Sequence, residues 1–96
     1  MRNSNLQPLK DVLNLLLKKY HLDSKLNEYR LLNSWEKVMG KLIAKHTEDL
    51  SISNKTLHIK INSAALRNEL SYAKDKMIKM LNEEIGQEVI TAIDLK

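Results

Sequence analysis

The run His46-Thr47-Glu48-Asp49 is the densest group of titratable side chains in the sequence. A histidine beside two carboxylates offers the residue types that bind a metal ion or move a proton as acid and base. No cysteine, glycine-rich phosphate loop or second histidine at ligand spacing accompanies the run. We therefore expect a chain that is not an enzyme and uses no metal and no cofactor. His46 and Thr47 are interpreted instead as side chains that cap the end of a helix.

The stretch from Trp35 to Thr47 leads into this run and contains the only tryptophan and the first of two glycines. Its apolar residues recur at helical spacing, at Trp35, Val38, Met39, Leu42 and Ile43. We expect one helix of about five turns that begins after Asp23 or Ser24 and ends near Thr47. Trp35 is expected in the core, and the alternative is a base-stacking platform on an exposed basic face. Gly40 inside this helix predicts a tight packing site or a bend.

An earlier helix is expected to begin at Pro8, after a polar lead over residues 1–7. Its apolar stripe consists of Leu9, Val12, Leu13, Leu16, Leu17 and Tyr20. Leu15 lies off the stripe, so the helix carries more leucine than one buried face needs. The favoured interpretation is that this surplus covers the open side of a small core. The alternative is a binding site for a protein partner, made by Leu15, Lys18 and Lys19.

After Thr47 the apolar period shortens from about 3.6 to about 2, which indicates strands. Residues 49–52 and 56–61 alternate apolar and polar side chains on either side of a turn at 53–55. We expect these segments to pair as an antiparallel hairpin with one apolar face and one wet face. His58 and Lys60 belong to the wet face.

A third helix is expected to start after Asn62-Ser63 and to end before Gly86. Residues 89–95 alternate again and predict a third strand, parallel to one strand of the hairpin because strand-helix-strand units cross over right-handed. The expected fold class is α+β, with the order α-α-β-β-α-β and helices packed on one face of a three-stranded mixed sheet. Residues 8–96 would form a single domain.

Several protein classes are excluded by composition. Zero cysteines exclude a disulfide framework and a zinc finger. No apolar stretch reaches the roughly 18 residues of a membrane span, and the N-terminal residues contain no small-residue cleavage site. We expect no signal peptide, no membrane partner and a cytoplasmic location.

Positive charge is concentrated in the N-terminal half of the sequence. Residues 1–47 contain nine Lys/Arg against four acids and carry +5, whereas the remaining residues carry −1. Such a bias favours an anionic partner, although excess lysine is also typical of an ordinary solvated surface. The side chains expected to contact phosphates are Lys37, Lys41, Lys45, Lys55, His58, Lys60, Arg67 and Lys74.

Three motifs carry a resemblance to a known family. They are W-x-x-V-x-G-x-x-I-x-x-H-T over residues 35–47, L-x-I-x-I-x-S-x-A-L-x-x-E-L over residues 57–70, and N-E-E-I-G over residues 82–86. The order and spacing of these motifs resemble those of the DciA-like family, and the resemblance extends over essentially the whole chain. The resemblance implies a fold like the type II K-homology domain. It also implies a non-catalytic loader or regulator of the bacterial replicative helicase that associates with single-stranded or forked DNA. Within it, Trp35, Gly40, His46 and Thr47 form a structural motif.

The sequence departs from true K-homology domains at one point. The G-x-x-G loop that clamps a nucleic-acid backbone is replaced by Leu70-Ser71-Tyr72-Ala73-Lys74-Asp75. We therefore expect phosphate contacts rather than sequence-specific reading of RNA, and no small-molecule substrate. Two alternatives stay open: an RNA-binding module of the K-homology type, and a protein-only adaptor whose lysines serve solubility.

Overall fold

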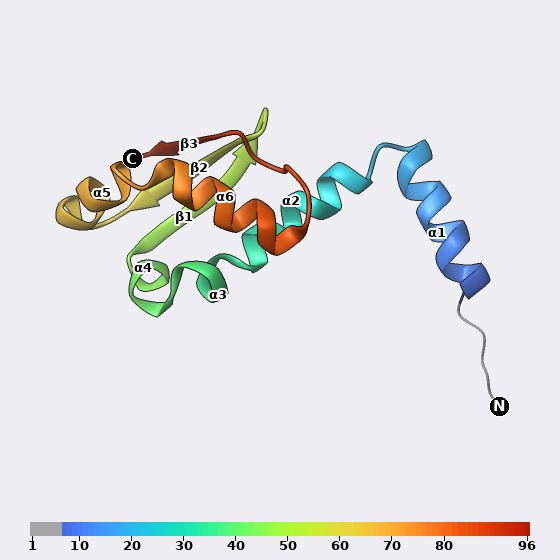
Figure 1. The fold of residues 1–96 in the computed structure, drawn as a ribbon, viewed down its shortest axis with the longest axis horizontal. Coiled ribbons are helices and arrows are strands. Elements are labelled where there is room, and N and C mark those ends of the chain that lie inside the picture. Colours follow the sequence, from blue (N-terminus) through green and yellow to red (C-terminus); the bar gives the residue numbers. More distant parts are fainter. Residues whose placement is uncertain (1–6) are drawn as a thin grey trace.

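A computed structural model describes residues 7–96, and residues 1–6 of the predicted polar lead lie outside it. It shows an α+β chain with a mixed sheet, as expected (Figure 1). Its elements are α1 (Gln7–Lys19), α2 (Asp23–Asn33), α3 (Trp35–Met39), α4 (Lys41–Lys45), β1 (Thr47–Ser53), β2 (Thr56–Ile61), α5 (Ala64–Ser71), α6 (Lys74–Ile85) and β3 (Ala92–Leu95).

The sheet has the order β1-β2-β3, with β1 antiparallel and β3 parallel to β2. Both predicted pairings are thereby confirmed. The hairpin turn places Asn54 at φ 51° and Lys55 at φ 59°. Two consecutive positive φ values are typical of the two-residue turn that matches the twist of a hairpin.

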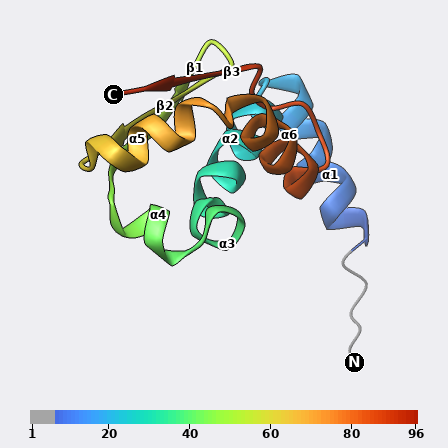
Figure 2. The same ribbon diagram turned by 60° about the vertical axis from the view of Figure 1, so that its left-hand side comes forward.

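One face of the sheet forms the core. Leu57, Ile59 and Ile61 of β2 are at most 2% exposed and share one apolar cluster with Leu31 of α2 and Leu81 of α6. Figure 2 shows the sheet at the top of the view with α2 to α6 below it. The opposite face is left open, which agrees with the predicted one-sided packing.

Both long helices expected from the sequence are interrupted, so the prediction of continuous helices is wrong. The first breaks at Ser34 and again at Gly40, and the second breaks between Ser71 and Lys74. A straight helix over residues 64–85 would be about 33 Å long, whereas a six-residue strand such as β2 spans about 20 Å. A break lets both halves of the segment pack on the short sheet.

Gly40 ends α3 with φ 93° and ψ 167°, a conformation open to glycine and strained for other residues. No atom lies within 4 Å of the position that a Cβ would occupy. The predicted tight packing site is therefore wrong, and the change of direction between α3 and α4 is what requires glycine. Gly86 follows α6 in the left-handed conformation, as expected.

Trp35 is 4% exposed, which confirms the core interpretation. Its Nε1 donates to Thr47 Oγ1 at 3.0 Å, and that hydroxyl donates to the carbonyl of Ile43 at 2.6 Å. Thr47 therefore caps α4 as predicted. The prediction for His46 is wrong, because its ring contacts Asn62 Oδ1 at 2.8 Å instead. Together these bonds join the entry of β1 to α3, α4 and the exit of β2.

The third strand is shorter than the predicted 89–95. Asn82 Oδ1 accepts hydrogen bonds from the backbone N–H groups of Val89 and Ile90, and Asn82 Nδ2 donates to the carbonyl of Ile90. These backbone groups are satisfied by a side chain of α6 and do not join the ladder. β3 consequently begins at Ala92.

Helix α1 begins at Gln7, one residue before the predicted start, and contains no buried residue. It stands away from the sheet and contacts α2 among the covering helices, and the molecule is 55 Å long (Figure 1). The favoured prediction that this helix covers the core is therefore wrong. Its length and apolar content also fall short of a membrane-crossing helix, as do those of the other helices within residues 7–96.

Gly40→Ala is expected to lower the free energy of unfolding by about 1–3 kcal/mol. The added Cβ would clash with no neighbouring atom, but alanine is strained at the positive φ of this position. Urea unfolding measures the change. Gly86→Asn is the control, because asparagine tolerates the left-handed conformation and should cost less than about 1 kcal/mol. An alanine variant as stable as the parent chain would contradict the assigned backbone geometry.

Thr47→Val is expected to lower the free energy of unfolding by about 1–3 kcal/mol, because it leaves Trp35 Nε1 and the Ile43 carbonyl without their partner. Fluorescence of the single tryptophan reports unfolding. Thr47→Ser keeps the hydroxyl and should retain most of the stability. Equal losses in the two variants would show that the hydroxyl is not the stabilising group.

Candidate nucleic-acid and partner interface

The first candidate surface is the α1 stripe, defined by the exposed side chains Leu9, Val12, Leu13, Leu16 and Tyr20. Leu15 is 68% exposed on the same helix, so apolar side chains extend beyond the stripe. An isolated helix of 13 residues is marginally stable in water, and helices of this length normally depend on packing of their apolar face. This geometry is suited to a partner that offers an apolar groove.

Basic side chains border the C-terminal end of α1. Lys18 and Lys19 occupy its last turn, where positive charge interacts favourably with the helix dipole. Lys19 Nζ also lies 5.7 Å from the centre of the Tyr20 ring. The predicted partner residues Leu15, Lys18 and Lys19 are all exposed.

The side chains predicted to contact phosphates lie on several parts of the fold. Lys37 forms an ion pair with Glu84 at 2.7 Å, and Lys60 lies 3.7 Å from Glu48. Lys41 and Lys45 are exposed one turn apart on α4. Lys55 lies at the tip of the hairpin. The structure therefore does not gather all of these residues into one patch.

Arg67 and Lys74 are brought together. They line a hollow of about 340 Å³ whose other lining residues are Ala64, Asn68, Ser71 and Leu95. Arg67 Nη2 donates to the carbonyl of Ile61 at 3.0 Å, which fixes the guanidinium beside the sheet. The Nε of Arg67 is buried and has no hydrogen-bond partner among the described residues.

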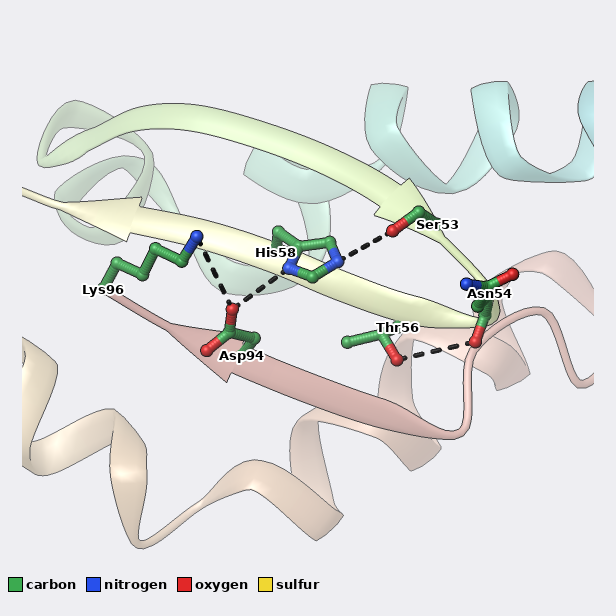
Figure 3. Close-up of polar contacts among 6 residues, drawn as sticks. All are labelled: Ser53, Asn54, Thr56, His58, Asp94 and Lys96. Carbon is green, nitrogen blue, oxygen red and sulfur yellow. Dashed lines mark hydrogen bonds and ion pairs between the residues drawn. The ribbon is translucent and has the colours of Figure 1, made fainter.

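His58 belongs to a network on the open face of the sheet (Figure 3). Its Nε2 lies 2.9 Å from Ser53 Oγ, and its Nδ1 lies 3.1 Å from Asp94 Oδ2. Lys96 Nζ is 3.9 Å from the same carboxylate oxygen. With the proton on Nδ1, the ring donates to Asp94 and accepts from Ser53, so the network ties all three strands together.

Serine, histidine and aspartate in this order are also the groups of a nucleophilic triad. A triad needs, in addition, donors for an oxyanion and a site that holds the substrate beside the hydroxyl. Ser53 is exposed at the end of β1 on the open sheet face. We interpret the network as a cross-strand connection. Both ring nitrogens of His58 are engaged in it, and its predicted phosphate contact stays a prediction.

The sequence singled out neither Ser53 nor Asp94 for chemistry, because strand pairing alone brings them to His58. It also left Tyr72 without a role. A signal for Tyr72 was present, since it lies off the apolar seam of its segment and close to Lys74. The run His46-Thr47-Glu48-Asp49 does not form a site: His46 turns to Asn62, and Glu48 lies beside Lys60.

Comparison with known proteins agrees with the resemblance noted in the sequence. A search of curated proteins found no match to the sequence of this chain. The family described as Dna[CI] antecedent, DciA, matches residues 8–95. The match covers nearly all of the 96 residues, and the chain therefore belongs to the DciA family, which is associated with loading of the bacterial replicative helicase.

Proposed function

We propose that this chain is a non-catalytic loader or regulator of the replicative helicase that holds the helicase through α1 and contacts DNA through its basic side chains. The observation behind this proposal is that the α1 stripe is exposed and that α1 contains no buried residue, Leu17 being its one half-buried side chain. Membership of the DciA family supports the replicative helicase as the partner.

The apolar side chains of α1 favour a helix-in-groove contact. Val12, Leu13 and Leu16 follow the i, i+1, i+4 spacing of one helix face and are each between 45% and 53% exposed. Burial of one leucine side chain contributes roughly 1.5–3 kcal/mol, so a few such residues account for a specific complex. Lys18 and Lys19 at the rim would then favour an acidic border on the helicase.

The DNA contact is supported by charge rather than by a base-reading element. Lys41, Lys45, Lys55 and Lys74 form no ion pair among residues 7–96, so their charges are free to meet phosphates. Contacts of this kind position a strand without reading its sequence. Competition between DNA and RNA of equal length separates this function from an RNA-binding module. A protein-only adaptor would capture the helicase and shift no nucleic acid.

Leu16→Glu is expected to weaken binding to the replicative helicase by about tenfold to a hundredfold, because a charge replaces a buried leucine at the contact. Isothermal calorimetry with the purified helicase measures the affinity. Asn14→Glu is the matched control, since it adds the same charge off the stripe of the same helix. Neither variant should change urea unfolding, because α1 contains no buried residue. If both variants bound the helicase with equal affinity, the α1 stripe would not be part of the interface.

Binding of single-stranded DNA is expected to weaken about tenfold to twentyfold between about 50 and 200 mM salt, if about three phosphates are neutralised. Fluorescence anisotropy of a labelled strand follows the change. Lys41→Gln should lower the slope of log affinity against log salt by about 0.7. Lys79→Gln should leave it unchanged, because Lys79 lines a hollow on α6 that it shares with Glu83 and Glu88. An affinity for single-stranded DNA that does not change with salt concentration would contradict the proposed phosphate contacts.

A further inference from the structure

The turn between α5 and α6 exposes an aromatic ring. Tyr72 is 83% exposed, more than any other large hydrophobic side chain within residues 7–96. Its hydroxyl makes no hydrogen bond within residues 7–96, so neither packing nor a polar partner in the described part of the chain accounts for its position. A ring left in water in this way is suited to stacking against a flat group from outside.

Cationic groups adjoin this turn. Ser71 and Lys74, on either side of Tyr72 in the chain, both line the hollow that also contains Arg67. Arg67 uses one N–H group in its bond to Ile61, although a guanidinium has five to donate. Lys74 is free of ion pairs within residues 7–96. Glu69 and Asp75 are the acids within three residues of Tyr72, and with Arg67, Lys74 and Lys76 the segment 67–76 keeps a net charge of +1.

Stacking aromatics in nucleic-acid sites are exposed and have basic neighbours. Trp35 fails this requirement because it is buried in the core. Tyr20 directly follows α1 with Lys19 beside its ring, within the surface proposed for the helicase. Tyr72 is exposed and lies two residues before Lys74, and the α5–α6 turn that carries it is at the opposite end of the molecule from α1 (Figure 1).

We infer that the α5–α6 turn is a binding site for single-stranded DNA, in which one unpaired base stacks on Tyr72 while Arg67 and Lys74 hold neighbouring phosphates. The positive lining of the hollow selects an anionic ligand, and the exposed ring selects one with a flat face. Single-stranded DNA combines both properties, whereas duplex DNA keeps its bases stacked on one another. This inference rests on the proposed DNA contact and assigns a location and a strand preference to it.

Fluorescence anisotropy with a labelled thymidine 20-mer tests the site in the full chain. Tyr72→Ala is expected to weaken binding by about fivefold to a hundredfold, which is the range for loss of one stacked base. Tyr72→Phe keeps the ring and should bind within about twofold of the parent chain. Tyr29→Ala is the matched control, because Tyr29 is 64% exposed but lies on α2, away from the hollow.

A strand of the same length with abasic sites separates stacking from charge. It retains its phosphates, so the parent chain and Tyr72→Ala should bind it with the same affinity. Tyr72→Ala should also leave the salt slope unchanged, whereas Lys74→Met should lower it by about 0.7 because one phosphate contact is lost. Urea unfolding of each variant confirms that the fold is retained.

Two results would overturn the inference: equal binding of the thymidine strand by Tyr72→Ala and the parent chain, or equal losses in Tyr72→Ala and Tyr29→Ala. Salt-dependent binding that survives the loss of Tyr72 would place the DNA contact elsewhere and leave the proposed function intact. No binding by the parent chain at low salt would refute both the site and the DNA part of that function. The helicase contact of α1 would not be affected by this result, because calorimetry with Leu16→Glu tests it separately.

Discussion

Burial of one face of β2 is the interaction on which the rest of the structure depends. Leu57, Ile59 and Ile61 are almost completely removed from water, and they share their cluster with Leu31 and Leu81. A three-stranded sheet with a single apolar face needs only the helices that cross that face. The remaining helix, α1, and the outer face of the sheet are consequently left open to partners.

Features that depend on a local pattern could be predicted from the sequence. The hairpin could be predicted because apolar and polar side chains alternate along both of its strands, and this period of two is typical of β-strands. Ser63 accepts from the N–H of Leu66 and Gly86 adopts the left-handed conformation, since caps are set by one or two residues. Trp35 lies in the core because its apolar neighbours recur at helical spacing.

Features that depend on tertiary structure could not be predicted. The apolar period continues across Ser34 and across the α5–α6 turn, because the pieces on both sides face the same core. Nothing in the stripe of α1 distinguishes packing against this chain from packing against another protein. The Ser53–His58–Asp94 network requires the register of three strands, which no single segment contains. The position of Tyr72 off the apolar seam is visible in the sequence, whereas its exposure depends on the turn between α5 and α6.

The two proposed surfaces lie at opposite ends of a chain 55 Å long, so a helicase on α1 would leave the α5–α6 turn accessible to a strand (Figure 1). On this proposal the α1 stripe, which is exposed within residues 7–96, is covered by the helicase. Hydrogen exchange of the amides of α1, with and without the replicative helicase, tests it most directly. We predict rapid exchange in the isolated chain and strong protection in the complex, with the sheet protected in both. Amides of α1 that are already protected in the isolated chain, or that stay unprotected in the complex, would contradict the claim.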